Sequence, residues 1–453
     1  MKIVVVGCGK IGEAILRALA AEGHDLTVVD DKSSVISEIV NKHDVMCICG
    51  NGVDCEVLEE ADIKNTDLFI AVTGSDELNM LSCLLAKRMG AKHTIARIRN
   101  PEYNDKSLGF MREQVDLSMS INPELLTAGE LYHMLKLPAA AKVESFSRRN
   151  FEMIELLLKE DSPFCGTPLW TLREKNSAKF LICVVQRGEK VFIPDGGFVL
   201  EGGDRIGLTA KPSEMQKLLK SLGLSKKHAK GVMILGGSRI AFYLSKMLLG
   251  SGSAVKVIDV DRNACRTFSE HVHGASVICG DGTHQELLLE EGLLEQDAFL
   301  ALTGMDEENI LVSCYAAAQH VQRVIAKVNR DEMAAMAAQL GLESIVSPKS
   351  ITVNVVLRYA RALQSSMGSA KIETLYQLMD GKAEAVEFVV TEASFLTGKP
   401  LKELPIRKNT LIAGIVRSRV PIIPGGDDAI LPGDHVVVIS SEHRLNDLTD
   451  ILR

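Results

Sequence analysis

Aromatic side chains are scarce in this sequence: 4% of its 453 residues are Phe, Trp or Tyr, and a single one is Trp. Proteins that bind single-stranded nucleic acid stack the bases on aromatic rings, so this scarcity argues against that class. Positive charge is not in excess either, because the formal net charge is −8, whereas nucleic-acid surfaces need clustered Lys and Arg. We therefore expect no nucleic-acid partner.

Long apolar runs are also missing. The longest stretch without Asp, Glu, Lys or Arg is Asn309–Gln322, which has 14 residues, and a membrane-spanning helix needs about 18–20. The apolar run near the N-terminus, Ile3–Val6, is too short for the core of a signal peptide. The expectation is an intracellular protein that does not insert into a membrane.

No Cys-x-x-Cys pair occurs among the ten cysteines. Cys47, Cys49, Cys183 and Cys279 lie inside apolar, strand-like runs, where cysteine behaves as a small hydrophobe. We interpret the cysteines as reduced core residues of a cytosolic protein, with a zinc or redox role as the alternative. No metal site is predicted.

What the sequence does have is a glycine-rich opening. Ile3–Val6 is typical of a buried parallel strand, and Gly7, Gly9 and Gly12 follow in the spacing G-x-G-x-x-G. In a dinucleotide site these glycines make the tight turn, admit the pyrophosphate and let the helix pack on the strand. The helix N-terminus adds free N–H groups for the phosphates. The alternative is a tight strand-to-helix turn without a ligand.

An acidic residue follows the glycine-rich loop at the spacing that is typical of a dinucleotide site. Asp30 ends the next strand, 18 residues after Gly12, close to where a carboxylate holds a ribose diol. The carboxylate favours NAD over NADP, whose 2′-phosphate it would repel. It does not separate NAD from ATP or ADP, because all three carry the same free diol.

Strand-like runs near 26–30, 45–49, 68–72 and 93–97 alternate with helical segments. This alternation predicts crossovers and a doubly wound parallel sheet, in which ligands bind beyond the carboxyl ends of the strands. Several candidate site residues fall at that edge: Asn51 and Gly52 in a turn, Thr73 and Gly74 after the fourth strand, and Arg97. Thr73 has a second interpretation, as part of a helix N-cap region with Ser75.

The pattern changes after about residue 120. A helix is expected over Pro123–Leu137, a small-residue joint at Ala139–Ala141, and a small α+β module of short strands to about Leu224. Lys226–Lys230 is interpreted as a solvated basic linker.

Beyond that linker the whole plan recurs at an almost constant offset. Gly236 follows Gly7 by 229 residues and Asp259 follows Asp30 by 229, while Thr303 follows Thr73 by 230. A constant offset across elements so far apart indicates an internal repeat. We therefore predict an α/β protein with two tandem Rossmann-like doubly wound domains, each followed by a small α+β module. The expected boundaries are 1–120, 121–225, 230–348 and 349–453.

The two glycine-rich loops are not equal. Ser238 and Ala241 stand where the first repeat has Gly9 and Gly12, and Ser238 adds a side chain where a pyrophosphate must come close. We expect the second site to bind more weakly, differently or not at all. Lys10 and Arg239 share one loop position, and Lys327 takes the place of Arg97; each cation could neighbour a phosphate or be solvated.

The motifs described above resemble those of a known protein family. The chain resembles the TrkA family, the peripheral regulatory proteins of Trk potassium-uptake systems, which have two tandem RCK (regulator of K⁺ conductance) units. The likeness rests on Val6–Gly12, Val28–Asp30, Cys49–Gly52, Ala71–Asn79 and Ile95–Arg99, with Gly203-Asp204 and Gly433-Asp434 in the smaller modules.

The resemblance implies a nucleotide-sensing regulatory subunit, not an enzyme. It would bind NAD (NADH), or ATP and ADP, and assemble as a homo-oligomeric ring on the cytoplasmic face of a TrkH-type membrane potassium transporter. The residues that it implies for ligand binding are these: Gly7, Cys8, Gly9, Lys10, Ile11, Gly12, Asp30, Asn51, Gly52, Thr73, Gly74 and Arg97 in the first repeat, and Gly236, Gly237, Ser238, Arg239, Ile240, Asp259, Thr303, Gly304 and Lys327 in the second.

Two alternatives stay open. An NAD-dependent oxidoreductase would need a general acid or base near the nicotinamide, and no His/Asp, Lys/Asp or Tyr/Lys constellation stands at a telling spacing. A nucleotide-responsive transcriptional regulator would need a helix-turn-helix and a basic face, neither of which the acidic chain shows clearly.

Overall fold

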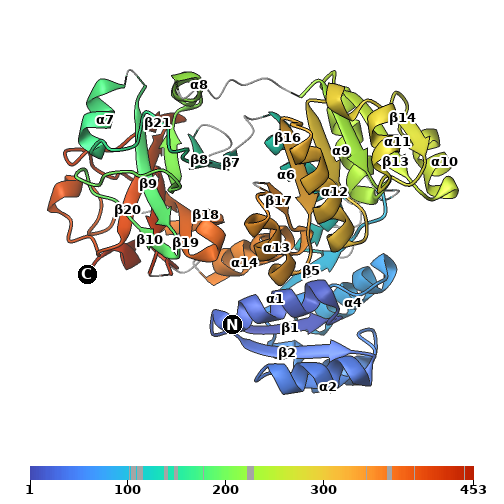
Figure 1. Cartoon of the computed structure of the whole chain (residues 1–453). Helices are drawn as coiled ribbons and strands as arrows, with labels where there is room; N and C mark the ends of the chain where they lie inside the picture. Colours follow the sequence, from blue (N-terminus) through green and yellow to red (C-terminus); the bar gives the residue numbers. More distant parts are fainter. Residues whose placement is uncertain are drawn as a thin grey trace. The chain divides into compact units, whose positions relative to one another are not determined.

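The first repeat begins with β1 (Lys2–Val6), whose apolar side chains are buried because helices cover both faces of its sheet. The computed structural model (Figure 1) describes residues 1–101, 103, 109, 116–136, 141–146, 151–176, 178–221, 229–342, 344–364, 370–391, 393–442 and 444–453. These residues form two compact units: one holds residues 1–131 and 230–360, and the other holds 132–229 and 361–453.

In the first unit, the first parallel sheet has the strand order β3-β2-β1-β4-β5-β6. Its elements are β1, α1 (Lys10–Ala21), β2 (Asp25–Asp30), α2 (Ser33–Lys42), β3 (Met46–Cys49), α3 (Cys55–Glu60), β4 (Leu68–Ala71), α4 (Asp76–Met89), β5 (His93–Arg97) and β6 (Met119–Ile121), and then helix α6 (Pro123–Lys136). The order reverses between β1 and β4, so the switch point of the sheet lies between the glycine-rich loop and Thr73.

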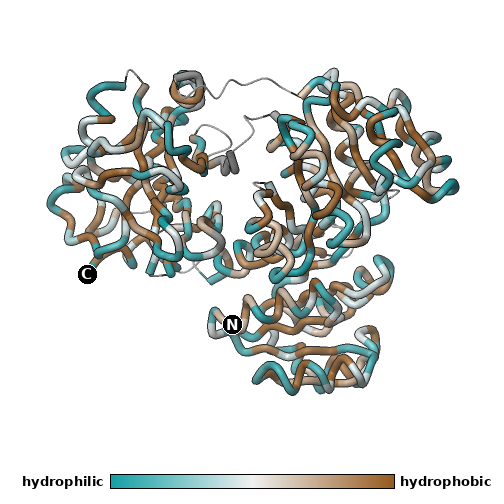
Figure 2. The backbone as a smooth tube through the Cα atoms, in the orientation of Figure 1, coloured by the Kyte–Doolittle hydropathy of each residue, from teal (hydrophilic) through white to brown (hydrophobic). Residues whose placement is uncertain are grey.

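The second sheet of this unit repeats the first, in the order β14-β13-β12-β15-β16-β17. Its elements are β12 (Gly231–Leu235), α9 (Arg239–Gly250), β13 (Ala254–Asp259), α10 (Arg262–His271), β14 (Ser276–Cys279), α11 (Gln285–Glu290), β15 (Ala298–Ala301), α12 (Asp306–Ala318), β16 (Arg323–Lys327), α13 (Asp331–Gln339), β17 (Ile345–Val346) and α14 (Pro348–Gln364). In the hydropathy colouring of Figure 2 the strands of this unit run mostly brown, as buried parallel strands do.

The second unit holds two antiparallel sheets. The first module, in the order β10-β9-β11-β8-β7, consists of β7 (Ala141–Phe146), β8 (Phe151–Leu157), α7 (Leu169–Lys175), β9 (Phe180–Arg187), β10 (Lys190–Phe192), β11 (Arg205–Ala210) and α8 (Pro212–Ser221). The second, in the order β18-β19-β22-β20-β21, consists of β18 (Ala370–Leu378), β19 (Ala383–Val390), β20 (Thr410–Arg417), β21 (Val420–Ile422) and β22 (His435–Ser440).

Side chains of both modules share one core inside this unit. Phe146, Phe151 and Val184 of the first module pack in one cluster with Ala385 and Val437 of the second. The hydroxyl of Thr209 also donates to the carbonyl of Ala413, at 3.1 Å. The two modules therefore bury a common apolar face.

The predicted fold class, two tandem doubly wound domains each followed by a smaller module, is confirmed. The short edge strands β6 and β17 were not predicted, because runs of three and two residues carry almost no periodicity. The core assignment of the cysteines holds for Cys183 but is wrong for Cys49 and Cys279, which are exposed on β3 and β14 because these strands end their sheets. Residues 139–140 and 226–228 of the two predicted joints lie outside the described residues.

Candidate functional site

A cavity of about 1210 Å³ lies in the first unit, beyond the carboxyl ends of β1, β2, β4 and β5. Its walls come from both repeats. The first repeat contributes the glycine-rich loop, the end of β2 and the loop after β4, and the second contributes the starts of α9, α12 and α14. This is the edge of a doubly wound sheet at which ligands bind.

The glycine-rich loop is shaped by steric demand. Gly7 has φ +88°, and a Cβ there would lie 2.8 Å from the Cα of Thr73. A Cβ on Gly12 would lie 2.0 Å from the carbonyl oxygen of Gly7, so this glycine lets α1 pack against the loop. A Cβ on Gly9 would meet no atom within 4 Å, which leaves the backbone at the start of α1 accessible from the cavity that Gly9 lines.

The start of α1 keeps unpaired donors. Gly9 is the N-cap residue, and within the described chain no side chain caps this helix. The first N–H groups of a helix have no partner inside the helix and carry the positive end of its dipole. Together they make a site for an anion such as a phosphate.

Asp30 is tied to the same loop. Its Oδ2 accepts the N–H of Cys8 at 2.7 Å, and its Oδ1 accepts the N–H of Lys32 at 3.0 Å. These bonds hold the carboxylate at the rim of the cavity, which Asp30 also lines. A carboxylate oxygen has two lone pairs, so both oxygens retain acceptor capacity for a ribose diol.

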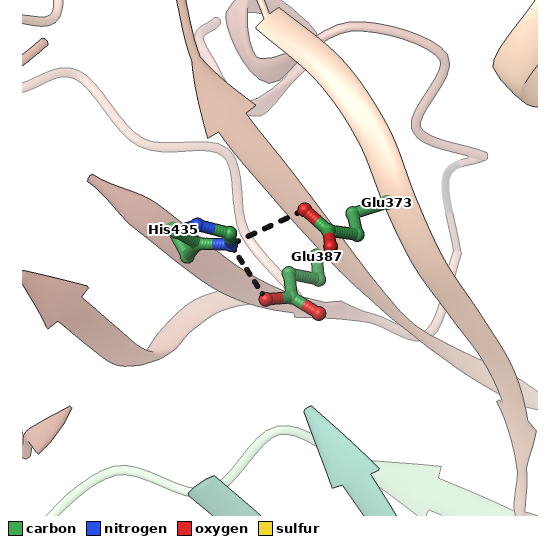
Figure 3. Close-up of side chains that lie close together, drawn as sticks. All are labelled: Glu373, Glu387 and His435. Carbon is green, nitrogen blue, oxygen red and sulfur yellow. Dashed lines mark hydrogen bonds and ion pairs between the residues drawn. The ribbon is translucent and has the colours of Figure 1, made fainter. Parts of the chain in front are cut away.

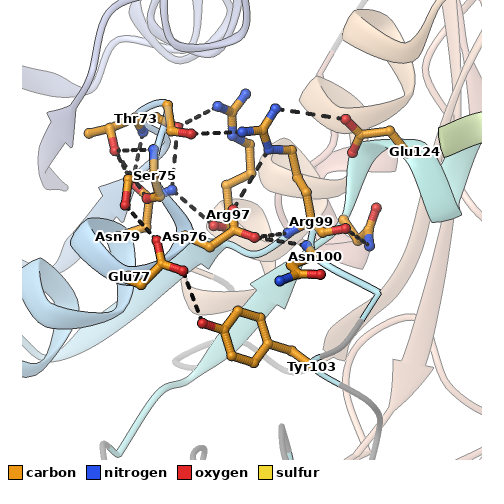
Figure 4. Close-up of polar contacts among 12 residues, drawn as sticks. Thr73, Ser75, Asp76, Glu77, Asn79, Arg97, Arg99, Asn100, Tyr103 and Glu124 are labelled. Carbon is orange, nitrogen blue, oxygen red and sulfur yellow. Dashed lines mark hydrogen bonds and ion pairs between the residues drawn. The ribbon is translucent and has the colours of Figure 1, made fainter. Parts of the chain in front are cut away.

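The loop after β4 is organised by a buried asparagine (Figure 4). Asn79 is fully buried, and its Oδ1 accepts the N–H and the hydroxyl of Thr73 at 2.8 and 2.7 Å. Its Nδ2 donates to the carbonyl of Arg97 at 2.9 Å, while the Arg97 guanidinium donates to the carbonyl of Thr73. Thr73 therefore lines the cavity with its polar groups already engaged, and Ser75 caps α4 by accepting the N–H of Leu78.

A buried carboxylate joins the same loop to the chain after β5. Asp76 accepts the N–H groups of Arg99 and Asn100, each at 2.8 Å. The Arg99 guanidinium donates to the carbonyl of Gly74 at 2.7 Å and lies 4.0 Å from Glu124. Figure 4 shows these side chains converging between the two strand ends. Asp76, Asn79 and Arg99 lie in Ala71–Asn79 and Ile95–Arg99, two segments that carry the family resemblance, but no role in the site was predicted for them from the sequence.

Two cations near the cavity are costly to bury. Burial lowers the pKa of the Arg97 guanidinium, and the nearby charge of Arg99 lowers it further. Burial likewise lowers the pKa of Lys327 from its usual 10.5, against the opposing effect of Asp306. Among the described residues, the Nε of Arg97 has no hydrogen-bond partner. An anionic ligand would favour the charged form of both groups.

The second repeat has corresponding hydrogen bonds, but the N-terminus of its helix α9 is capped by a side chain. Asp259 accepts the N–H of Gly237 at 2.6 Å, as Asp30 does for Cys8, and Asn309 accepts the N–H of Thr303 at 3.0 Å. In contrast to Gly9, Ser238 caps its helix, because its hydroxyl accepts the N–H of Ala241 at 3.4 Å. The donors at the start of α9 are thus partly used by the chain itself.

The residues named from the sequence divide into two groups by position. Those lining the cavity are Gly7, Gly9, Lys10, Ile11, Asp30, Asn51, Gly52, Thr73, Gly74, Arg97, Ser238, Arg239, Ile240, Gly304 and Lys327. Those that do not line it are Cys8, Gly12, Gly236, Gly237, Asp259 and Thr303. The sequence predicted two sites, whereas this cavity brings the first repeat's residues together with part of the second loop.

The two repeats also touch beside the cavity. Asn122 donates to the hydroxyl of Tyr243 on α9 at 3.1 Å, and Tyr243 donates to the carbonyl of Arg99 at 3.4 Å. An ion pair of 2.9 Å joins Arg17 on α1 to Asp331 on α13. These contacts connect the loop after β5 to the helix that Ser238 caps.

None of the helices in the described ranges is long and apolar enough to cross a membrane. Most of the residues predicted from the sequence line the cavity described above.

The model of the TrkA-N domain matches residues 3–113 and 232–348, and that of the TrkA-C domain matches 153–223 and 385–453. A Trk system potassium uptake protein TrkA homolog of Archaeoglobus fulgidus is 33% identical over 453 residues, covering 100% of both chains. A homolog of Methanosarcina mazei is 32% identical and covers 97% of each chain.

Solved structures share the fold. The GsuK channel bound to NAD matches with a TM-score of 0.64 at 18% identity, covering 97% of this chain and 77% of that one. The chain belongs to the TrkA family of Trk system potassium uptake proteins.

Proposed function

We propose that this protein is a nucleotide-sensing regulatory subunit of a potassium-uptake transporter. The observation that carries the proposal is the cavity in which the open start of α1, the carboxylate of Asp30, the partly buried Arg97 and the buried Lys327 meet. Its family membership supports the potassium-uptake part of the proposal.

The ligand that we propose is NAD(H), ATP or ADP. The loop from Gly7 to Gly12 would hold the pyrophosphate, Asp30 the adenosine ribose, and Arg97 a phosphate. Asn51, Gly52, Thr73 and Gly74 would line the nucleotide's edge. The GsuK channel bound to NAD supports a dinucleotide on this fold, and the cavity volume lies above the usual 300–1,000 Å³ of small-molecule pockets.

The second repeat would bind differently. We propose that Ser238, Arg239, Ile240, Gly304 and Lys327 act on the ligand of the shared cavity, rather than on a nucleotide of their own. The capped start of α9 supports this reading, because its N–H groups are less available to a phosphate. Gly236, Gly237, Asp259 and Thr303 would then hold the frame of the second loop. The domain boundaries 1–120, 121–225, 230–348 and 349–453 are proposed with this division of roles.

In this proposal the protein works as a regulator rather than as an enzyme. It assembles as a homo-oligomeric ring on the cytoplasmic face of a TrkH-type membrane transporter. Nucleotide binding gates K⁺ flux because the ligand binds one arrangement of the assembly better than another; a ligand with equal affinity for both would shift nothing.

Binding and flux are tested separately. Titration of the full chain with NADH, NAD, ATP and ADP measures the affinity and the number of sites. Copurification with a potassium transporter, followed by flux measurements under each nucleotide, tests the regulatory role. Failure to associate, or flux that ignores every nucleotide, contradicts it, and substrate-dependent turnover of NADH would favour an oxidoreductase instead.

Gly9→Asp is the sharpest variant for the binding site. The new carboxylate would project into open space, so the fold survives, but it would meet the pyrophosphate. Two like charges 4 Å apart cost about 4 kcal/mol at an effective dielectric of about 20, or about a thousandfold in affinity. Gly250→Asp is the matched control, because its Cβ would also meet no atom within 4 Å and Gly250 does not line the cavity. Equal affinities for the two variants would contradict the proposed site.

A further inference from the structure

In the second unit, three side chains of types that can bind metal ions converge on one face of the second module (Figure 3). They are Glu373 on β18, Glu387 on β19 and His435 on β22. The Nδ1 of His435 lies 3.0 Å from Oε1 of Glu387 and 3.4 Å from Oε2 of Glu373. Among the described residues, theirs is the group whose ligand atoms all lie within 4.8 Å of one another.

These separations suit a small cation. Zn²⁺ binds His nitrogen at about 2.0–2.1 Å and carboxylate oxygen at about 2.0–2.2 Å, with tetrahedral geometry. Bonds of that length place neighbouring ligand atoms about 3.3–3.5 Å apart, close to the distances from His435 to the two carboxylates. One nitrogen and two oxygens do not suit Ca²⁺, which takes six to eight oxygen ligands.

The strand pairing explains why the third ligand reaches the cluster. β18 pairs with β19 through a register shift between Ile372 and Thr374, so Glu373 is the extra residue at a bulge. A bulge redirects a side chain relative to the regular alternation of a strand. Glu387 is fully buried, whereas the side chains of His435 and Glu373 are 30% and 37% exposed. A cation could therefore enter from solvent and keep water as a further ligand.

The first module provides an internal comparison. Glu155 pairs in register with Gly207 as Glu387 pairs with Val437, so Arg205 stands where the second module has His435. Arg205 forms an ion pair with Glu155 at 2.8 Å. Arginine carries a fixed positive charge and has no lone pair for a metal, whereas neutral imidazole is the commonest metal ligand. At equivalent positions, the first module has the cationic side chain of Arg205, whereas the second module has His435 beside two carboxylates.

From this difference we infer that Glu373, Glu387 and His435 form a binding site for a divalent transition metal of the Zn²⁺ class. The ion ties β18 to β19 and β22. Because β18 follows α14 in the chain, the ion stiffens the strand by which the chain enters the second module. The site belongs to the second unit and does not depend on the proposed nucleotide function.

The test compares the full-length wild-type protein with three full-length variants, all prepared free of metal. Zn²⁺ binding is measured by competition with a chromophoric chelator, and thermal unfolding is followed with and without Zn²⁺. His435→Arg copies the ion pair of the first module and Glu373→Gln changes a partly exposed side chain, so both keep the fold. Glu403→Gln, an exposed carboxylate of the same module outside the cluster, is the control.

Wild type and Glu403→Gln should each bind one Zn²⁺ equivalent at this site. His435→Arg and Glu373→Gln should bind that equivalent at least about tenfold more weakly, since even changes to residues that only contact a metal ligand cost about 10–100-fold in affinity. At one fixed Zn²⁺ concentration, the unfolding temperature of wild type and Glu403→Gln should rise more than that of His435→Arg and Glu373→Gln. Equal binding by all four proteins, or no Zn²⁺ binding by wild type, would overturn the site. Should His435→Arg fail to fold, the comparison of Glu373→Gln with Glu403→Gln decides.

Discussion

At the scale of single residues, the candidate site depends on side chains that form hydrogen bonds to the backbone of its loops and do not line the cavity themselves. Asn79 satisfies the N–H and hydroxyl of Thr73 and the carbonyl of Arg97 at once. Buried backbone groups that lose such a partner carry the full cost of desolvation. The position of Thr73 beside Gly7 therefore follows from an asparagine that does not line the cavity.

Asn79→Ala should destabilise the first repeat by about 2 kcal/mol, because it removes the partner of two part-buried backbone groups at about 1 kcal/mol or more each. It should also weaken nucleotide binding, since Thr73 and Arg97 lose their common anchor. Chemical denaturation and nucleotide titration measure the two effects. Asn309→Ala is the matched variant: it removes the same bonds from Thr303 and Lys327, so it should destabilise the second repeat by a similar amount. A stable Asn79→Ala protein would show that the network is dispensable.

Asp306 predicts an acid dependence of stability. Burial by itself would raise the pKa of this carboxyl, but hydrogen bonds from the N–H groups of Arg330 and Asn329 outweigh it, and the pKa is lowered from 3.8. A carboxyl whose pKa is lower in the folded state stabilises the fold above its unfolded pKa, and loses that contribution as pH falls through the folded pKa.

Asp306→Asn should therefore reduce stability near pH 7 and make the loss below about pH 4 less steep than in wild type. Denaturation midpoints measured from pH 7 to pH 2 give both slopes. Glu286→Gln, which changes an exposed carboxyl in the same repeat, is the control. Parallel curves for wild type and Asp306→Asn would contradict the assigned role.

At the scale of elements, the two repeats differ at the start of the helix that follows the glycine-rich loop, α1 in the first and α9 in the second. The N-cap residue of α1 is Gly9, which offers no side chain, whereas the N-cap residue of α9 is Ser238, whose hydroxyl caps the helix. A cap stabilises a helix, but it uses donors that a phosphate would otherwise take. The same fold can thus have an uncapped helix N-terminus in one repeat and a capped one in the other.

Ser238→Gly should open the second loop at little cost, because replacing an N-cap serine by glycine costs a few tenths of a kcal/mol. Nucleotide titration should then show tighter binding or an additional site. Ser238→Ala removes the cap without restoring glycine's open backbone approach, so it should cost about 1 kcal/mol and bring a smaller gain in binding. Identical titrations for wild type and Ser238→Gly would mean that the capping hydroxyl does not limit the second loop.

At the scale of the whole molecule, duplication gives each unit a pair of related parts. In the first unit, two sheets contribute to one cavity. In the second, two modules bury one apolar face, where a Cβ on Gly414 would lie 2.2 Å from the ring of Phe151. Changes on that face should act on both modules together.

Gly414→Ala should destabilise the paired modules by about 1–3 kcal/mol, the usual cost of overpacking a core. Thermal unfolding of the full chain measures the effect. Gly425→Ala in the same module is the control, because the nearest atom to its added Cβ would be a side-chain oxygen of Asp428 at 3.7 Å. An unchanged transition in Gly414→Ala would mean that Phe151 moves aside freely.

Much of the fold could be predicted because the determining signals are local or repeated. Uninterrupted apolar runs such as Ile3–Val6 indicate buried parallel strands, glycine spacing indicates the turn after β1, and the offset of 229 to 230 residues identifies the duplication. The strand over His93–Arg97 was predicted with the bounds that the structure gives. The edge strands were missed, because pairing with a neighbour rather than local pattern creates them.

The chemistry that each repeat can offer follows from its residues alone: the first repeat has Gly9 in its loop together with Asp30, and the second has Ser238 in place of Gly9. Tertiary structure alone decided which of these groups meet, because the cavity gathers residues about 230 positions apart. It also decided that Asn79 serves Thr73 and Arg97, and that Glu373, Glu387 and His435 converge from three strands. Such contacts depend on sheet order and register, which fix distances between residues that no local pattern connects.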